Sequence, residues 1–188
     1  MSVVEGVPWN SARKTATGAR DGDTLRSVCG RFATGVTVVA AGGQAPCGMT
    51  ANSFTSVSMR PPLILVCVNR DASIHQAVVE RGSFAVSILS AHQEQVARYF
   101  ADHSRPRGAA EFDSVDWSPA PSTGAPVLDG ALAWIDCGLA ACYDGGDHVI
   151  FLGSVLASGW RPEHDALLFF GGGFHRPQLV KPALRETA

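Results

Sequence analysis

Charged residues are scarce in this sequence and are not clustered. Of 188 residues, 17% are charged, and 15 lysines and arginines nearly balance 17 aspartates and glutamates, for a formal net charge of -2. Proteins that bind nucleic acid or anionic membrane surfaces need a run or patch of positive charge. Since no such run occurs, we expect neither nucleic acid nor a membrane as a partner.

Long apolar runs are missing as well. No stretch approaches the roughly 18 apolar residues needed to span a bilayer, and the N-terminal segment lacks the apolar region of a secretory signal. With 46% hydrophobic residues, the chain still has enough material for the core of one domain. We expect a cytoplasmic protein with a flexible tail at residues 1–22, one domain at residues 23–176 and a second tail at residues 177–188.

The cysteine pattern favours neither a disulfide framework nor a metal site. The number is odd, the residues lie in apolar stretches, and no two are spaced as CxxC. They are Cys29, Cys47, Cys67, Cys137 and Cys142. Reduced thiols are therefore expected, with no bound metal.

Two common catalytic signatures are also missing. No strand is followed by the GxGxxG turn of a Rossmann fold, and no carboxylate pair or Ser/His/Asp set stands out. If this protein binds a nucleotide cofactor, it must do so with another fold.

Hydrophobic patterning predicts short strands joined mainly as hairpins, with a few short helices. An N-terminal helix is expected from Asp23, with Leu25, Val28 and Phe32 on one side and Gly35 at its end. Residues 101–130 are rich in Pro, Gly, Ser and Asp and predict a long loop. Further helices are expected at residues 73–82, capped by Ser73, and 91–101, and strands at residues 35–41, 45–51, 63–69, 83–89, 131–143, 148–160 and 166–170.

This order of elements predicts a mainly β protein that forms an antiparallel barrel rather than a doubly wound sheet. Residues 63–69 show no polar alternation, which predicts a strand buried on both faces. Residues 148–155 are likewise apolar on both faces, more than one small barrel needs. This second strand therefore indicates contact with another subunit.

Small polar residues gather in the segment GMTANSFTSVS, residues 48–58, directly before an apolar strand. Such residues offer backbone N–H groups, hydroxyls and little bulk, which suits the approach of a flat, hydrogen-bonding ring. A solvated turn explains the same composition equally well. After the next strand, Ser73 at a helix start adds a candidate phosphate site, because helix N-termini present unpaired N–H groups.

Several segments, taken in order, resemble the short-chain flavin reductases, the reductase components of two-component flavin-dependent monooxygenases. They are RFATGVTVV, GMTANSFTSVSMRPPLILVCVNR, SFAVSIL, APVLDGALAWIDC, GGDHVIFLGSV and LLFFGGGFH, and together they span roughly residues 24–176. The resemblance implies a split antiparallel β-barrel homodimer that binds FAD or FMN and reduces it with NADH or NADPH. It also implies a separate flavin-dependent monooxygenase that receives the reduced flavin.

The resemblance also assigns site residues. It places the flavin ring at Thr50, Ala51, Asn52 and Ser53 with Ser56 nearby, and the ribityl chain and phosphate along Cys67, Val68, Asn69 and Ser73. A basic residue usually lies near the phosphate in this family, and Arg70 and Arg98 are the candidates. His148 is expected at the nicotinamide face as the catalytic-site residue that positions the dinucleotide, together with Phe174 and His175.

Other interpretations remain open at this stage. His148 could simply satisfy a turn, and His175 could be an exposed tail residue. A non-catalytic split-barrel protein that binds flavin or haem is the main alternative to an enzyme, since fold alone does not separate the two. An oxidase of the pyridoxamine-phosphate type lacks the basic residues expected to bind a second phosphate. No arginine pair awaits a 2′-phosphate, which favours NADH, and FAD is favoured over FMN only by analogy.

Overall fold

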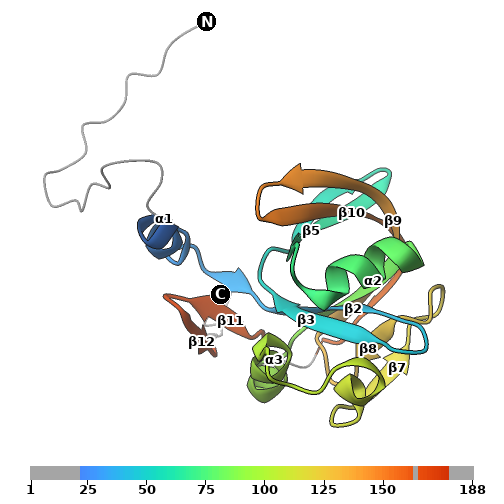
Figure 1. The fold of residues 1–188 in the computed structure, drawn as a ribbon. Coiled ribbons are helices and arrows are strands. Elements are labelled where there is room, and N and C mark those ends of the chain that lie inside the picture. The colour runs from blue at the N-terminus through green and yellow to red at the C-terminus, as the bar shows by residue number, and fades with distance from the viewer. Residues whose placement is uncertain (1–21, 163–164, 178–188) are drawn as a thin grey trace, which may run out of the picture.

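Seven antiparallel strands form the main sheet in the computed structural model, which describes residues 22–162 and 165–177 (Figure 1). The strand order is β3-β2-β6-β9-β10-β5-β4. The strands are β2 (Thr37–Ala41), β3 (Cys47–Ala51), β4 (Thr55–Met59), β5 (Pro62–Asn69), β6 (Ser83–Ile88), β9 (Ala133–Gly145) and β10 (His148–Trp160). The tails expected at residues 1–22 and 177–188 lie almost wholly outside the described residues.

Two of the predicted hairpins are confirmed in detail. Strands β2 and β3 pair from Thr37↔Ala51 to Ala41↔Cys47 across a short turn. Strands β9 and β10 each have 13 residues and pair along their whole length. Their turn contains Gly146 at φ +81°, a conformation that only glycine adopts at little cost. Local turn chemistry was therefore sufficient to predict both hairpins.

Two smaller sheets complete the β structure. One contains β1 (Thr34–Gly35), β11 (Leu168–Phe170) and β12 (Gly173–His175), and the other pairs β7 (Trp117–Pro119) with β8 (Pro126–Leu128). The long loop predicted at residues 101–130 is wrong in part, because it contains β7, β8 and a 3₁₀ turn, η2 (Gly108–Phe112). Strands of three residues are too short for alternation to reveal them.

Strand β5 differs from its prediction. Ile64, Val66 and Val68 are buried, whereas Leu65 and Cys67 are only half-buried, so the strand alternates instead of burying both faces. Ser53 Oγ is hydrogen-bonded to the backbone of Cys67, and Phe54 packs against the core that contains Ile64, Val66 and Val68. Strand β5 therefore contacts the segment of small polar residues.

Three α-helices accompany the sheets: α1 (Gly22–Cys29), α2 (Ser73–Arg81) and α3 (Glu94–Ala101), the last preceded by a 3₁₀ turn, η1 (Ala91–Gln93). Helix α2 lies between β3 and the β5–β10 side of the barrel, and α3 lies beside β3 (Figure 1). The expected N-cap of α2 is wrong by one position, because Ala72 occupies it and Ser73 is the first helical residue.

Helix α1 stands apart from the barrel, next to β11 and β12 (Figure 1). It ends at Cys29 rather than at Gly35. The carbonyl of the next residue, Gly30, accepts a hydrogen bond from Gly171 N–H. Its apolar side chains do not enter the core: Leu25 is 62% exposed and Val28 63%. The helix was thus predicted, although its end was wrong, and no described residue buries Leu25 or Val28.

Strand β2 separates two hydrophobic cores, and all five of its residues are buried. Val39 points into the barrel core with Phe84 and Phe151, and helix α2 closes this core. Val38 points to the other side and packs with Phe100 under α3. The strand is therefore fixed on both faces and carries β3 rigidly at the edge of the sheet.

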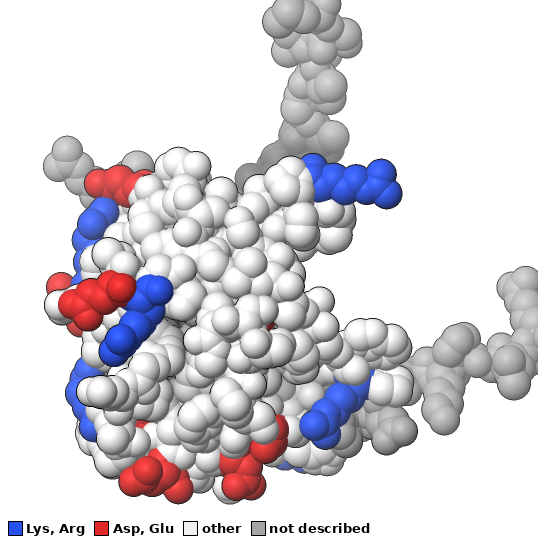
Figure 2. Space-filling view, turned by 90° about the vertical axis from the view of Figure 1, so that its right-hand side faces the viewer, with Lys and Arg blue, Asp and Glu red and all other residues white. Residues whose placement is uncertain are grey.

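Charge is distributed over the surface as the sequence predicts. On the face shown in Figure 2, charged side chains lie mainly at the rim and the centre is uncharged. Among residues 22–162 and 165–177, no helix is long and apolar enough to cross a membrane, and no three potential metal ligands come together.

Candidate active site

Four cavities follow one another along β3 and the segment after it. We name them the outer cavity (about 250 Å³), the central cavity (about 440 Å³), the narrow cavity (about 200 Å³) and the helix-side cavity (about 450 Å³). Neighbouring cavities share lining residues. The outer and central cavities share Ser73 and Arg107, the central and narrow cavities share Thr50 and Ala101, and the narrow and helix-side cavities share Asn52 and Phe169. The cavities therefore form one groove that runs from α2 to α1.

One wall of the groove is formed where side chains bind the backbone of β3 at its free edge. Gly48 N–H donates to Glu111 Oε1 at 3.0 Å, and the Gly48 carbonyl accepts from Arg105 Nη2. Arg105 Nε and Nη2 also donate to Glu111 Oε1, at 2.9 and 2.7 Å. We call these three residues the β3 clamp. An edge strand normally risks pairing with another chain, and here a buried ion pair occupies its backbone groups instead.

The clamp is almost fully buried. The side chain of Arg105 is 7% exposed and that of Glu111 is 1% exposed. A Cβ on Gly48 would lie 2.9 Å from Phe100 and 3.1 Å from Phe112, so a larger residue here would press against these two rings. Burial, and then the negative charge of Glu111, raise the pKa of the neighbouring Cys47 thiol to about 11. Cys47 is therefore a neutral thiol beside the groove.

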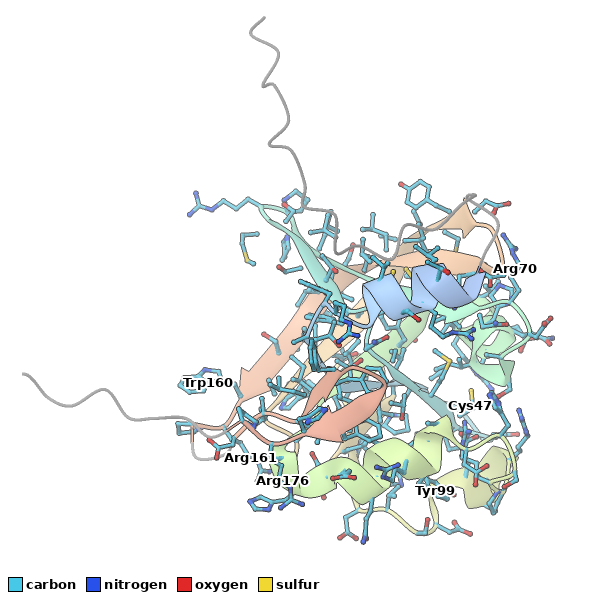
Figure 3. The ribbon with its side chains drawn as sticks, turned by 90° about the vertical axis from the view of Figure 1, so that its left-hand side faces the viewer. Cys47, Arg70, Tyr99, Trp160, Arg161 and Arg176 are labelled. Carbon is cyan, nitrogen blue, oxygen red and sulfur yellow. The ribbon has the colours of Figure 1, made fainter. Side chains whose placement is uncertain are left out.

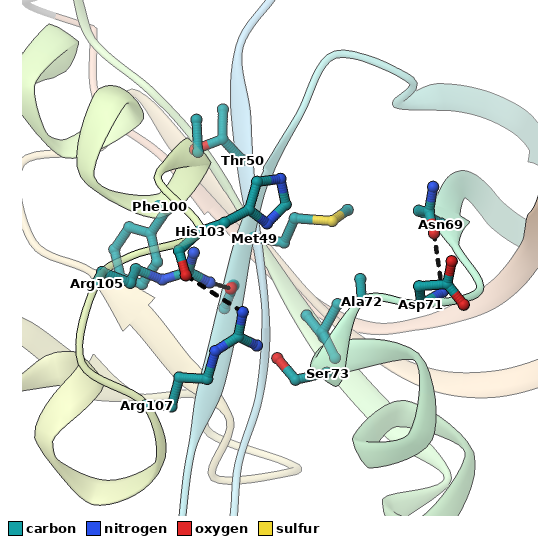
Figure 4. Close-up of a pocket in the computed structure, with 13 residues that line it drawn as sticks. Met49, Thr50, Asn69, Asp71, Ala72, Ser73, Phe100, His103, Arg105 and Arg107 are labelled. Carbon is teal, nitrogen blue, oxygen red and sulfur yellow. Dashed lines mark hydrogen bonds between the residues drawn. The ribbon is translucent and has the colours of Figure 1, made fainter.

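An anion-binding arrangement lies in the central cavity (Figure 4). Ser73 at the start of α2 faces Arg107 across it, with His103 on the same side as Arg107. The Arg107 guanidinium donates only to the His103 carbonyl, at 3.4 Å, and has no carboxylate partner within the described residues. Helix N-termini favour anions through their unpaired N–H groups and dipole. An exposed arginine opposite such a terminus provides the charge that a phosphate needs.

The two arginines predicted from the resemblance are both engaged elsewhere. Arg70 pairs with Asp144 at 3.0 Å, and Arg98 pairs with Glu94 at 2.8 Å and lies over the Phe174 ring. Neither lines the central cavity. Arg107 was missed because it lies in the segment expected to be a loop. The spacing of His103, Arg105 and Arg107 was the only available signal in the sequence.

The hydroxyls of the small polar segment are used internally. Thr50 Oγ1 donates to the Ala97 carbonyl at 2.7 Å. Ser53 Oγ accepts from Cys67 N–H and donates to the Cys67 carbonyl, both at 3.0 Å. These bonds tie the segment to α3 and β5. The side chain of Asn52 is exposed and lines both the narrow and the helix-side cavity, so it is the polar group of this segment that faces the groove.

The residues expected to bind the cofactor divide into two groups. Thr50, Asn52, Asn69, Ser73 and Phe174 line the four cavities, and Ala51, Ser53, Ser56, Cys67, Val68, His148 and His175 do not. The Val68 side chain is buried in the barrel core, so only its backbone can face the groove. Ser56 is exposed on β4. Burial raises the pKa of the half-buried Cys67 thiol.

Of the two predicted histidines, His148 is half-buried and His175 is exposed. His148 begins β10 opposite Asn69 of β5, and its Nδ1 lies 2.8 Å from Asp147 Oδ1. This hydrogen bond, followed by the charge of the imidazole, lowers the pKa of the Asp147 carboxyl. His175 Nε2 lies 3.0 Å from the Phe170 carbonyl at the β11–β12 hairpin. Both side chains are thus held by neighbours in the chain itself.

Comparison with known proteins defines the class to which this fold and groove belong. Residues 29–178 match the family described as flavin reductase like domain. The chain therefore belongs to the flavin reductase family, and the predicted family, split-barrel fold and oxidoreductase class are confirmed.

Individual relatives cover most of the chain. The NADH-dependent FAD reductase of Streptomyces globisporus is 53% identical over 157 residues, which are 84% of this chain and 86% of that protein. The FMN reductase (NADH) SmoA of Agrobacterium fabrum is 40% identical over 177 residues, 94% of this chain and 98% of that protein. The structure of BorF, the flavin reductase component of a bacterial two-component tryptophan halogenase, matches with a TM-score of 0.80 and 50% identity. The match covers 83% of this chain and 98% of the BorF chain.

Proposed function

We propose that this protein is an NADH-dependent flavin reductase that delivers reduced flavin to a separate flavin-dependent monooxygenase. The observation that carries the proposal is the groove, in which the exposed Asn52 and the anion-binding arrangement at Ser73 and Arg107 lie along one edge strand. A flavin has a flat ring at one end and a phosphate further along, and the groove offers matching groups in that order. The names of the relatives, two NADH-dependent reductases and a component of a two-component system, support the same activity.

The residues of this chain fit a bound flavin in two places. Backbone groups of residues 50–54, held in position by the hydroxyls of Thr50 and Ser53, would border the ring together with Asn52. Ser73 and Arg107 would hold the phosphate. The flavin, when bound, supplies the two-electron acceptor for the reduced nicotinamide. The protein then needs only to bind, orient and exclude water, so this reaction requires no acid–base pair from the residues that line the groove.

The nicotinamide is proposed to lie at the narrow cavity. Phe169 and Phe174 line this cavity, with their ring centroids 5.5 Å apart in an edge-to-face arrangement. These rings form an apolar wall beside Asn52. His148 and His175 are proposed to contact the amide or ribose of the dinucleotide, since His148 is half-buried, His175 is exposed, and each is bound to a close neighbour.

A homodimer is part of the proposal, as expected from the sequence. In the single chain, large apolar side chains are exposed after the end of α1, at the end of β4 and at the end of β10. Phe32 is 76% exposed, Met59 75% and Trp160 75%. Trp160, the last residue of β10, projects outward on the side of the molecule opposite Arg70 (Figure 3). Apolar exposure on this scale indicates a covering surface, and a second copy of the chain is the partner proposed here. A cytoplasmic location is also proposed, because NADH is generated and used there.

The proposed function has a direct test. Purified protein is mixed with NADH in air, with and without FAD, FMN or riboflavin, and the loss of NADH absorbance is followed. We expect oxidation only when flavin is present, because the flavin is a dissociable substrate. A non-catalytic flavin carrier would bind flavin and leave NADH unchanged, which would contradict the proposal. Light scattering at micromolar concentration tests the dimer separately.

A further inference from the structure

The outer cavity has no role in the function proposed so far. It lies between the exposed side of α2 and the segment that carries Arg107, and Ala45 of the β2–β3 turn lines its rim. It shares Ser73 and Arg107 with the central cavity, so the two meet at the anion-binding arrangement (Figure 4). A molecule whose phosphate lies there has room to continue beyond it.

The lining of the outer cavity is amphipathic. Cys47, a neutral thiol, and Ala77 contribute apolar surface. At the rim, Gln76 Nε2 donates to Glu80 Oε1 at 2.7 Å, and both residues line the cavity. Glu111 also lines it, and its Oε2 is buried without a hydrogen-bond partner among the described residues. Such a buried oxygen is costly to leave unpaired, which indicates a polar group that is bound there.

These features match a nucleoside joined to a phosphate. Apolar surface suits a base. A carboxylate at the rim can accept hydrogen bonds from ribose hydroxyls, as carboxylates do in other dinucleotide sites. FMN ends at its single phosphate, whereas FAD continues through a second phosphate to adenosine. Only the longer flavin reaches the outer cavity.

We propose that the outer cavity binds the adenylate half of FAD and makes the protein selective for FAD over FMN. Arg107 lies between the two phosphates, and Glu80 and Gln76 contact the adenosine at the rim. This inference rests on the proposed function, because it takes the phosphate at Ser73 and Arg107 to be that of a bound flavin. The family itself does not decide the matter, since its members include an FAD reductase and an FMN reductase.

The adenylate of NADH is a less suitable occupant. The nicotinamide must reach the flavin ring, and the aromatic wall at Phe169 and Phe174 lies beyond the central cavity from the outer one. A dinucleotide placed with its nicotinamide there would have to pass over the flavin phosphate to reach the outer cavity. The adenylate of FAD, in contrast, is joined to the proposed flavin phosphate through only one further phosphate, so it can enter the outer cavity directly.

The test compares three variants by flavin binding in the absence of NADH, measured by quenching of flavin fluorescence. Ala45→Phe fills the cavity from an exposed turn position, and Glu80→Ala removes the rim carboxylate. Gln44→Phe places the same bulk on the adjoining exposed residue, which does not line the cavity, and serves as the matched control. Circular dichroism and thermal melting verify that each variant is folded.

The unmodified protein should bind FAD more tightly than FMN. Ala45→Phe should raise the Kd of FAD about ten-fold or more, and Glu80→Ala several-fold, about the loss of one hydrogen bond. The Kd values of FMN and riboflavin should stay within about two-fold of those of the unmodified protein in all variants. The Kd of FAD should stay within the same range in Gln44→Phe. Equal affinity of the unmodified protein for FAD and FMN would overturn the inference, as would an equal loss of both flavins in Ala45→Phe.

Two further outcomes separate this inference from the proposed function. If Ala45→Phe raises the KM for NADH and leaves the Kd of FAD unchanged, the cavity binds the NADH adenylate and the inference fails. If NADH is oxidised equally well with FAD, FMN and riboflavin, the reductase activity stands and only the selectivity is wrong. If no flavin binds and none is reduced, the proposed function fails first.

Discussion

Two regions with the same kind of interaction, an arginine bound to a carboxylate, lie on different sides of the groove. The β3 clamp buries Arg105 and Glu111 around Gly48. At the tip of the β9–β10 hairpin, Asp144 pairs with Arg70 from the turn after β5, and the side chains of Arg70 and Asp144 are 41% and 83% exposed. In the clamp, both partners also bind the backbone of β3, so the pair is part of the fold. At the hairpin tip, water can replace each partner, so the pair is adjustable.

This difference matters for function because each region presents different groups to the ligands. The clamp fixes the segment that carries His103 and Arg107, and so fixes the anion-binding side of the groove. The hairpin tip carries His148, which must be free to adapt to a dinucleotide that enters and leaves. A buried ion pair beside the flavin site and an exposed one beside the proposed dinucleotide site are consistent with a reaction in which both ligands dissociate.

Breaking the clamp should have the largest effect. Glu111→Gln leaves the Arg105 charge buried without its counterion, which typically destabilises a protein by about 3 kcal/mol or more. Urea unfolding followed by circular dichroism measures this loss. The matched change at the exposed pair, Asp144→Asn, should lower the unfolding midpoint far less. Equal effects of the two substitutions would mean that burial does not distinguish the regions.

A double apolar replacement gives a sharper form of the same test. Many buried ion pairs can be exchanged for apolar residues without loss of stability. Here Arg105→Met combined with Glu111→Leu should not restore stability, because Gly48 N–H and its carbonyl would lose their partners. A double variant as stable as the unmodified protein would show that the clamp is dispensable for the edge of β3.

Arg107 provides the second largest expected effect, now on binding. Arg107→Ala should raise the Kd of FMN and FAD about ten-fold, because a charged hydrogen bond to phosphate is lost, and should leave riboflavin unaffected. Arg70→Ala is the control, since Arg70 is bound to Asp144 and to the Gly146 carbonyl. Fluorescence titration with the three flavins checks the prediction. If Arg70→Ala instead weakens the binding of FMN and FAD but not of riboflavin, Arg70 is the phosphate-binding residue, as the resemblance suggested.

The sequence predicted those parts of the fold that depend on local patterns. A β-branched run before the turn GGQ was enough for β2–β3, and the turn DGGD between two apolar stretches was enough for β9–β10. The helix expected at residues 73–82 is also present, as α2. Strands β7 and β8 were missed because three residues carry no period. The exposed side of α1 could not be foreseen either, since periodicity shows that a face is apolar without showing what covers it.

The candidate site was predicted less completely, for a different reason. Gly48 and Glu111 are 63 residues apart in the sequence, and nothing near either residue signals their contact. The hydroxyls of Thr50 and Ser53 were expected to face a ligand, but their partners, Ala97 and Cys67, lie in other elements. Residue types therefore indicated where the groove lies, and long-range pairing determined which groups face it.

His148 tests whether the hairpin tip positions the dinucleotide. His148→Ala should raise the KM for NADH several-fold, as for one hydrogen bond of about 0.5–1.5 kcal/mol, and should change kcat and the Kd of flavin little. Steady-state kinetics with NADH varied at saturating flavin measure the effect. His92→Ala, on the exposed side of the 3₁₀ turn η1, is a control away from the groove. Unaltered KM and kcat would leave His148 as a residue of the turn.

The smallest effect is expected from pH at the hairpin tip. Hydrogen bonds from Gly146 N–H and the charge of Arg70 lower the pKa of the Asp144 carboxyl, and His148 lowers that of Asp147. A carboxyl whose pKa is lower in the folded state stabilises the fold above its unfolded pKa of about 3.9, and this contribution is lost as the pH falls through the folded value.

Asp144→Asn and Asp147→Asn should therefore lose a small part of the stability gained between about pH 2 and pH 5, and should match the unmodified protein at the acidic end. Thermal melting across this range measures the slope. The difference should shrink further in high salt, because both carboxyls are exposed and screened. A slope that persists in high salt, or one as steep as that expected for a buried carboxylate, would mean that the tip is as rigid as the clamp, and the contrast between the two regions would fail.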